Sequence, residues 1–142
     1  MIYTNMNNCY FIKDNVLPRE FTIHSMIIKA NIVNTPQIYK YDKTSMQLKM
    51  RNIPEMSVSD MYGEDFENVP SEIIDKIRDV IAVLYRYGIE YPDITGYNFI
   101  YYQNKIWIFD FGHASFNLDK SLYDPFILEF INGRNDWNPN YK

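Results

Sequence analysis

Apolar residues in this chain are grouped in short stretches, some alternating with polar residues and others recurring at helical spacing. The alternating and β-prone stretches are bounded by turn residues such as Asp14-Asn15 and Gln103-Asn104, so they predict short strands. We expect these strands at residues 9–12, 38–41, 46–50, 99–102 and 105–109. The last four of them form two pairs, each expected to be a hairpin.

Helices are expected between and after these strands. Pro18 suits the first position of a helix over residues 19–30, because its φ is fixed and its missing N–H would be unpaired there. The clearest helix follows Pro70, since apolar residues at 73, 74, 77, 80, 81 and 84 recur at helical spacing until Gly88 ends it. We interpret those apolar residues as scaffold. Shorter helices are expected over 58–62 and 122–131, followed by a polar tail.

The order of these elements predicts one α+β domain. The chain has 142 residues, of which 46% are hydrophobic and 23% charged, as in ordinary globular domains. We expect a small N-terminal β-rich lobe with one helix over about 9–53, and a reduced helical lobe over about 54–142.

Charge and composition restrict the partners. The net charge of -4 gives no general attraction to nucleic acid. The basic residues Lys40, Lys43, Lys49 and Arg51 are interrupted by Asp42 and flanked by Glu55. We therefore expect no nucleic-acid partner.

No targeting or membrane signal is found in the sequence. The single cysteine cannot form an internal disulfide, no apolar run approaches the roughly 18 residues of a membrane span, and residues 1–8 lack a signal-peptide core. These features predict a reducing, soluble compartment, the cytoplasm. The abundance of Ile, Asn, Tyr and Lys is also associated with AT-rich genomes, including those of large DNA viruses, which would place the protein in a host cytoplasm.

The candidate chemistry lies in two predicted loops that bracket a strand pair. Asp93 is followed five residues later by Asn98, and twelve residues after that comes Asp110 of an Asp-Phe-Gly motif. In protein kinases an Asp in the first position orients the acceptor hydroxyl, while the Asn and the second Asp hold magnesium ions. Carboxylate and amide oxygens suit Mg²⁺, a hard cation. The pattern predicts Asp93 as catalytic base and Asn98 and Asp110 as metal ligands.

Each residue has a simpler explanation when taken alone. Asp93 after Pro92 could be a turn carboxylate, Asn98 a loop residue bonded to its own backbone, and Gly112 a turn glycine. The joint spacing of the two loops is what favours the kinase-like interpretation.

A lysine that contacts the phosphates and pairs with a helix glutamate is also expected upstream. The best candidates are Lys13 at the end of the first strand and Glu20 near the start of the following helix. Their separation of seven residues is short, so the alternative is a surface lysine and an acid that stabilises its helix N-terminus. His24 is expected at the lobe interface rather than as a base.

These motifs resemble the small atypical protein kinases related to the kinase subunit of the KEOPS tRNA-modification complex. The resemblance includes Arg19-Glu20 and the segments 35–39, 93–98 and 124–129, with Thr95 where conventional serine/threonine kinases have Lys. It implies a catalytic Asp93, metal-binding Asn98 and Asp110, and an ATP-anchoring Lys13 paired with Glu20. It also implies an adenine contact along a hinge that includes Met50, Arg51 and Ile53.

The chain departs from the kinase pattern in three places. The first glycine is Gly63, so no glycine-rich phosphate loop precedes Lys13. Tyr91-Pro92-Asp93 replaces His-Arg-Asp, and no Ala-Pro-Glu follows Gly112. The Arg that usually pairs with a phosphorylated activation loop is missing at position 92, so any activity should not need phosphorylation of that loop. Asp124 could brace the catalytic loop or be an ordinary helix N-terminal acid.

Three functions are consistent with these residues. The first is a minimal serine/threonine protein kinase, or an ATPase, that uses ATP and Mg²⁺. The second is a pseudokinase-like module that binds a partner protein, a second copy of itself or another kinase-fold protein, because the missing phosphate loop and the 17% aromatic content suit an interaction role. The third, phosphorylation of a small molecule, fits the intact Asp-Phe-Gly less well.

Overall fold

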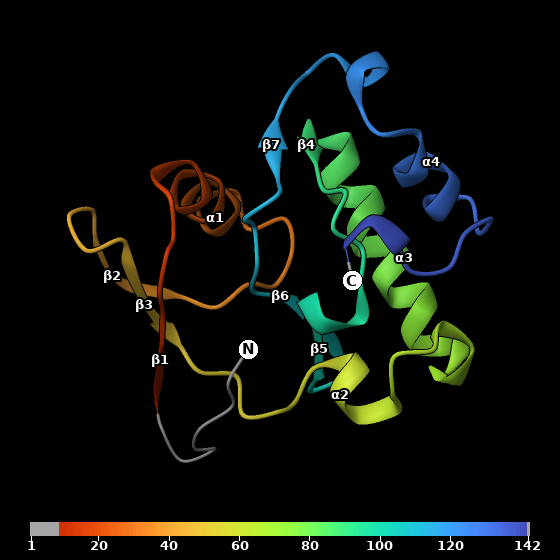
Figure 1. Cartoon of the computed structure of the whole chain (residues 1–142), viewed down its shortest axis with the longest axis horizontal. Helices are drawn as coiled ribbons and strands as arrows, with labels where there is room; N and C mark the ends of the chain where they lie inside the picture. The colour runs from red at the N-terminus through yellow and green to blue at the C-terminus, as the bar shows by residue number, and fades with distance from the viewer. Residues whose placement is uncertain (1–8, 142) are drawn as a thin grey trace.

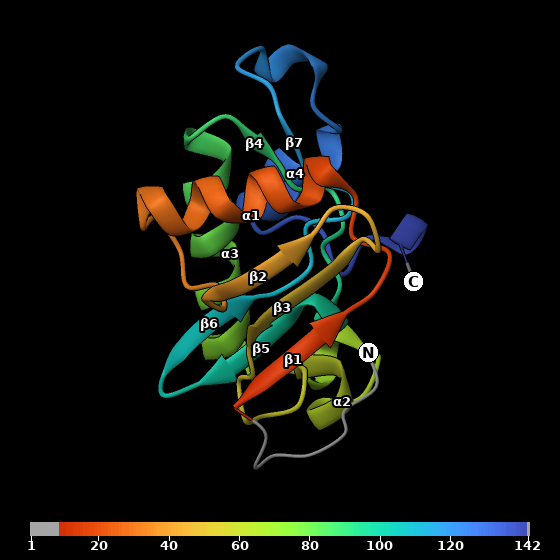
Figure 2. The same cartoon turned by 90° about the vertical axis from the view of Figure 1, so that its left-hand side faces the viewer.

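The computed structural model describes residues 9–141 and divides into a small sheet-and-helix part and a larger helical part (Figure 1). The small part contains strands β1 (Tyr10–Lys13), β2 (Ile38–Asp42) and β3 (Gln47–Arg51) and helix α1 (Pro18–Ala30). The strands pair antiparallel in the order β1-β3-β2. Figure 2 shows α1 running alongside this sheet.

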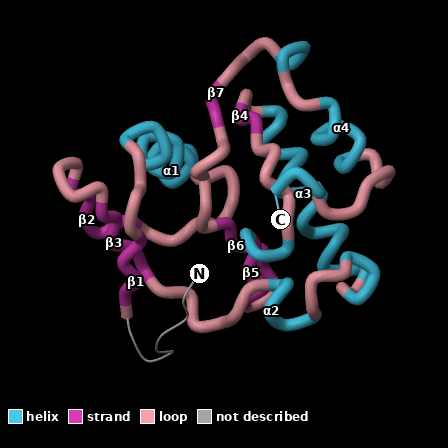
Figure 3. The backbone as a smooth tube through the Cα atoms, viewed as in Figure 1, coloured by secondary structure: helices cyan, strands magenta, loops and turns pink. Residues whose placement is uncertain are grey.

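The larger part is built around one long helix. Its elements are α2 (Val58–Tyr62), α3 (Ser71–Arg86), β4 (Ile89–Glu90), β5 (Phe99–Tyr102), β6 (Lys105–Ile108), β7 (Ser115–Phe116) and α4 (Pro125–Ile131). The β5–β6 hairpin turns through Gln103 and Asn104, both with positive φ. Loops make up most of the connection from β6 to α4 (Figure 3). No described helix combines the length and apolar character needed to cross a membrane.

The predicted helices and strands are present with small shifts in their bounds, and two larger differences stand out. The two-residue strands β4 and β7, which pair with each other, were not expected, because they are too short to carry a periodic signal. The last helix starts at Pro125 rather than at residue 122. Asp124 caps it by accepting a hydrogen bond from the Phe126 N–H at 3.0 Å, so Asp124 is a helix N-terminal acid.

Helix α1 joins the two parts by packing against both. Its Ile23 and Ile27 belong to the main core with α3 and α4, while Phe21 packs against the small cluster formed by Val16, Leu48 and Met50 under the sheet. A shared helix of this kind fixes the position of the small sheet over the larger part.

His24 lies where α1 meets both parts and is fully buried. Its Nε2 is 2.8 Å from the Pro36 carbonyl and 2.9 Å from Thr35 Oγ1, and Thr35 Oγ1 donates to the Ile108 carbonyl at 2.7 Å. A carbonyl only accepts, so Nε2 carries the proton of the neutral ring. His24 is thus an interface residue, as expected from the sequence.

Burial of His24 predicts that the fold weakens in mild acid. Desolvation, with a smaller effect of the Lys13 charge, lowers the His24 pKa from 6.5 to about 4, and the Pro36 carbonyl offsets this only in part. Between these values the unfolded chain binds a proton that the folded chain does not, so stability falls as the pH falls. From pH 7 to pH 5 this amounts to about 2 kcal/mol. Urea unfolding of the wild type and of His24→Gln at several pH values from 7 to 5 measures this loss of unfolding free energy. If the free energy of unfolding falls equally with pH in both proteins, His24 is not the group responsible.

Candidate functional site

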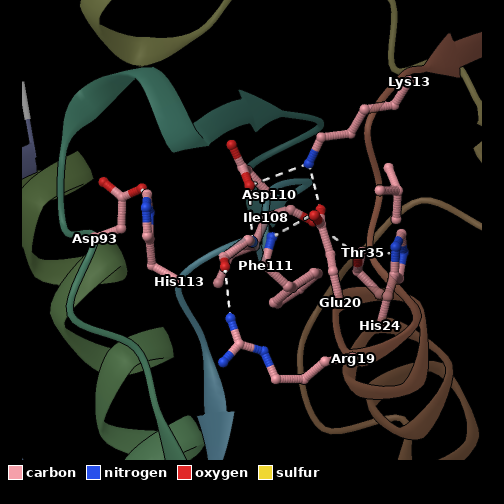
Figure 4. A network of polar contacts seen from close by, with 12 residues as sticks. Lys13, Arg19, Glu20, His24, Thr35, Asp93, Ile108, Asp110, Phe111 and His113 are labelled. Atoms are coloured by element: carbon pink, nitrogen blue, oxygen red, sulfur yellow. Dashed lines mark hydrogen bonds and ion pairs between the residues drawn. The ribbon is translucent and has the colours of Figure 1, made fainter. Parts of the chain in front are cut away.

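Lys13, Glu20 and Asp110 form one ion-pair cluster although they come from β1, α1 and the loop after β6. Lys13 Nζ pairs with Glu20 Oε2 and lies 3.1 Å from Asp110 Oδ1 (Figure 4). Seven residues suffice for the first pair because the turn at Asp14 and Asn15 brings α1 back beside the end of β1. The expected pair of Lys13 and Glu20 is therefore formed.

The Asp110 carboxylate is held in its charged form. Burial by itself would raise the pKa of this carboxyl, but Lys13, the Gly112 N–H and the more distant His113 outweigh it, so the pKa lies below its ordinary value. The Gly112 N–H donates to Asp110 Oδ1 at 2.9 Å, which fixes the loop around the carboxylate. An anionic oxygen of this kind can bind a cation at neutral pH.

The Asp-Phe-Gly loop is tied to both parts of the molecule. Arg19 donates to the Gly112 carbonyl at 3.1 Å, and buried Glu20 accepts from the Phe111 N–H at 3.4 Å. From the other side the Tyr91 hydroxyl donates to the Asp110 carbonyl at 2.6 Å. Tyr91, which stands where kinases have His, therefore supports the loop through its backbone.

A hydrogen bond joins Asp93 and Asn98 within the loop that precedes β5. Asn98 Nδ2 donates to the Asp93 carbonyl at 2.8 Å, so Oδ1 is the atom of Asn98 that would act as the predicted metal ligand. Asp93 Oδ2 accepts from His113 Nδ1 at 2.9 Å, whereas Asp93 Oδ1 is buried without a hydrogen-bond partner among residues 9–141. Burial of a carboxylate oxygen without a hydrogen-bond partner destabilises the folded state. This oxygen is therefore suited to accept a hydrogen bond from a bound ligand.

His113 and Asn138 are two site residues that sequence analysis missed. His113 follows Gly112 directly, and this position was its only signal. Asn138 is fully buried, donates from Nδ2 to the Pro92 carbonyl at 2.8 Å and from its backbone N–H to the Ile94 carbonyl at 2.9 Å. It lies in the segment expected to be a polar tail, where the neighbouring Trp137 was the only sign of packing.

A cavity of about 280 Å³ brings part of the predicted site together. Its lining is Phe11, Lys13, Tyr97, Asn98, Phe109 and Asp110. Asp93 does not line it and lies with His113 on the other side of Asp110 from Lys13 (Figure 4). Among the described residues no three His, Cys, Asp or Glu side chains form a metal cluster. Asn98 and Asp110 both line this cavity, and amide and carboxylate oxygens are the ligand types that Mg²⁺ prefers. Their role as metal ligands stays a prediction.

The predicted hinge lines a second, much smaller cavity. Met50, Arg51 and Ile53 border a space of about 20 Å³, which shares Phe11 and Phe109 with the larger one. That volume holds about one water. Met50 and Arg51 belong to β3 and pair with residues of β1, and Met50 also pairs with Ile38 of β2. Their backbone groups therefore belong to the sheet. An adenine ring does not fit in this volume, and the adenine contact stays a prediction.

No family model matches this sequence, but comparison with known proteins finds chains that are similar to it. The chain is 27% identical over 129 residues to a protein of Thermoplasma acidophilum named "Probable bifunctional tRNA threonylcarbamoyladenosine biosynthesis protein". That match covers 89% of this chain and 23% of the relative. The solved structure of the kinase PK-1 of Cydia pomonella granulovirus superposes with a TM-score of 0.55 and 14% identity, covering 75% of this chain and 43% of that one.

Both matches agree with the motifs and the geometry. The structural likeness shows the fold, and the match in sequence agrees with the resemblance found in the two loops. The chain spans less than a quarter of the length of the curated relative. This chain has a truncated protein-kinase-like fold and resembles the small atypical kinases related to the KEOPS-complex kinase subunit.

Proposed function

We propose that this protein is a minimal phosphotransferase that moves the terminal phosphoryl group of Mg-ATP to a serine or threonine hydroxyl of a protein. The observation that carries this proposal is the shared cavity of Lys13, Asn98 and Asp110, with Asp93 bonded to Asn98 in the adjacent loop. Phosphoryl transfer depends mainly on positioning and on charge neutralisation, which few residues can supply.

Each residue has a role that follows from its contacts. Asn98 Oδ1 and the Asp110 carboxylate are the oxygens that would hold Mg²⁺, which neutralises phosphate charge when bound. Lys13, fixed by Glu20, presents its ammonium to the same cavity and would bind phosphate oxygens. Asp93 Oδ1 is the available acceptor for the proton of the attacking hydroxyl, while Oδ2 is engaged by His113.

The absent glycine-rich loop limits the expected rate. From β1 only Phe11 and Lys13 line the cavity, so the phosphates would be covered by one strand rather than by a closed loop. Water exclusion and positioning would both be weaker than in a complete kinase. We therefore expect slow turnover in the isolated protein.

A pseudokinase-like binding module is the second candidate. Two observations favour it: the hinge cavity is too small for adenine, and His113 already occupies one oxygen of Asp93. Under this alternative the protein binds a partner protein and turns over little or no ATP.

Thermal unfolding and turnover separate these candidates. Mg-ATP should raise the melting temperature of the wild type above that with ATP and EDTA, because a ligand of the folded state stabilises it. Asp110→Asn should lose this magnesium-dependent shift and lose ATP hydrolysis and autophosphorylation. Asp79→Asn, an exposed residue of α3, is the matched control and should behave as wild type. A shift without turnover supports the binding module, and unchanged turnover in Asp110→Asn overturns the metal assignment.

A further inference from the structure

The outer face of the β1-β3-β2 sheet carries cations and apolar side chains on the side away from the candidate site. Strand alternation turns Phe11, Leu48 and Met50 inward, toward Phe21 of α1. The opposite face therefore receives the residues between them. These are Tyr10, Ile12, Lys40, Lys49 and Arg51, which we call the cationic sheet face.

The register places the charges close together. Tyr10 faces Arg51, and Lys49 lies between Ile12 on one side and Lys40 on the other. Within residues 9–141 no carboxylate lies within ion-pair distance of Lys40, Lys49 or Arg51. The fold thus assembles a basic patch on a chain of net charge -4, which the linear sequence did not indicate.

Two acids lie at the hairpin end of this face: Asp42, which the register places on the same side as Lys40, and Asp14, which accepts from Gln47 Nε2 at 2.9 Å. Asp42 lies at the hairpin end of β2 and accepts from the Thr44 and Ser45 N–H groups at 2.9 and 3.2 Å. The Ser45 and Thr44 N–H groups lower its pKa and outweigh the opposing effect of burial, while the Ser45 hydroxyl and Lys40 contribute less. Its carboxylate is held mainly by its own turn, and it forms no ion pair with Lys40 among the described residues.

Exposed rings and an aliphatic side chain lie among these cations. Tyr10 is 45% and Ile12 47% exposed, and Tyr39, at the irregularity in β2, is 53% exposed. Lys49 Nζ lies 4.1 Å from the centre of the Tyr10 ring, whereas Arg51 at the end of β3 lies 5.6 Å from the centre of the partly buried Trp107 ring on β6 of the larger part. Solvent-facing strand positions would ordinarily be polar, so exposed tyrosines beside unpaired cations indicate a contact surface.

We propose that the cationic sheet face binds single-stranded nucleic acid. Lys40, Lys49 and Arg51 would contact successive phosphates, and the exposed tyrosines would stack on unpaired bases. A twisted sheet with rings among its cations suits an unpaired strand better than a duplex, whose bases are covered. The exposed rings also favour nucleic acid over an acidic peptide, which offers charge without flat apolar groups.

This surface adjoins the site described above only at Arg51, which also borders the small hinge cavity. Lys13 and Phe11 point to the inner side of β1, whereas Tyr10 and Ile12 point outward. The proposal does not depend on the kinase activity, and an inactive protein could bind a strand in the same way.

Fluorescence anisotropy with labelled 12-nucleotide RNA and DNA single strands tests the proposal. Binding should weaken with salt, with a slope of log K against log salt of about -2 for three phosphate contacts. The pair Lys40→Ala and Lys49→Ala should reduce the slope by about 1.4, while the control pair Lys29→Ala and Lys105→Ala, exposed elsewhere, should leave it unchanged. Tyr10→Ala should weaken binding roughly tenfold.

Other outcomes overturn the proposal. Absence of single-strand binding at 50 mM salt would contradict it. So would an equal reduction of the salt slope in the Lys40 and Lys49 variant and in the Lys29 and Lys105 control. Equal affinity for polyglutamate or for vesicles of anionic lipid, with no effect of Tyr10→Ala, would show a general anion surface instead. Circular dichroism of each variant confirms that the sheet is folded.

Discussion

Asp93→Asn is expected to reduce phosphoryl transfer by about 10²- to 10⁴-fold while leaving Mg-ATP binding intact. The reduction is the usual contribution of a general base, because an amide cannot take the hydroxyl proton. Binding should survive because Asp93 does not line the cavity formed by Lys13, Asn98 and Asp110. The fold should also survive, since an amide oxygen can accept the same bond from His113.

The decisive measurement is turnover beside the magnesium-dependent thermal shift in the same preparation. Asp110→Asn should lose both, whereas Asp93→Asn should lose only turnover. Wild-type turnover in Asp93→Asn would exclude this residue as the base. Loss of the thermal shift in Asp93→Asn would contradict the separation of base and metal ligands.

Gly96→Ala is expected to destabilise the protein by about 3 kcal/mol and to disturb the magnesium site at the same time. A Cβ at Gly96 would lie 2.1 Å from Ser59 Oγ and 3.1 Å from Trp137 Cζ2. Gly96 is buried and begins the turn Gly96–Asn98, so relief of this overlap requires a new Ser59 rotamer and, for the remaining contacts with Ser59 Cβ and Trp137, a shift of α2 or of the turn that contains Asn98. Urea unfolding and the Mg-ATP thermal shift both report the change.

The double variant Gly96→Ala with Ser59→Ala is the control. It removes the Oγ and leaves Ser59 Cβ at 3.2 Å, a contact that a small shift can accommodate. Part of the lost stability should return, with a coupling of about 1–2 kcal/mol between the two positions. Wild-type stability of the single variant would show that the loop and α2 separate more easily than the structure indicates.

Local patterns were sufficient for most of the elements. The periodic apolar residues of α3, the Pro18 start of α1 and the turns of both hairpins each depend on neighbouring residues, so the sequence alone predicts them. The start of α4 was misplaced because Pro125 was not treated as its first residue, although Asp124 before it is an ordinary N-cap. Strands β4 and β7 pair with each other although they are far apart in the sequence. A local sequence pattern does not predict such a pairing.

The candidate site divides in the same way. The spacing of Asp93, Asn98 and Asp110 predicted two loops, and the fold places Asn98 and Asp110 on one cavity. The bond of Asp93 to His113, the support from Asn138 and the small volume at Ile53 were not predictable, because each depends on side chains that meet only after packing.

The sequence by itself determined a small α+β kinase-like chain with oxygen ligands at fixed spacing, since motif spacing and periodicity are properties of the linear chain. Only the tertiary structure decided that Lys13 reaches Asp110 and that Asp93 faces His113. It also decided that the cations of β2 and β3 share one outward face with Tyr10. These arrangements depend on strand register and on the packing of α1, which bring together residues from separate parts of the chain.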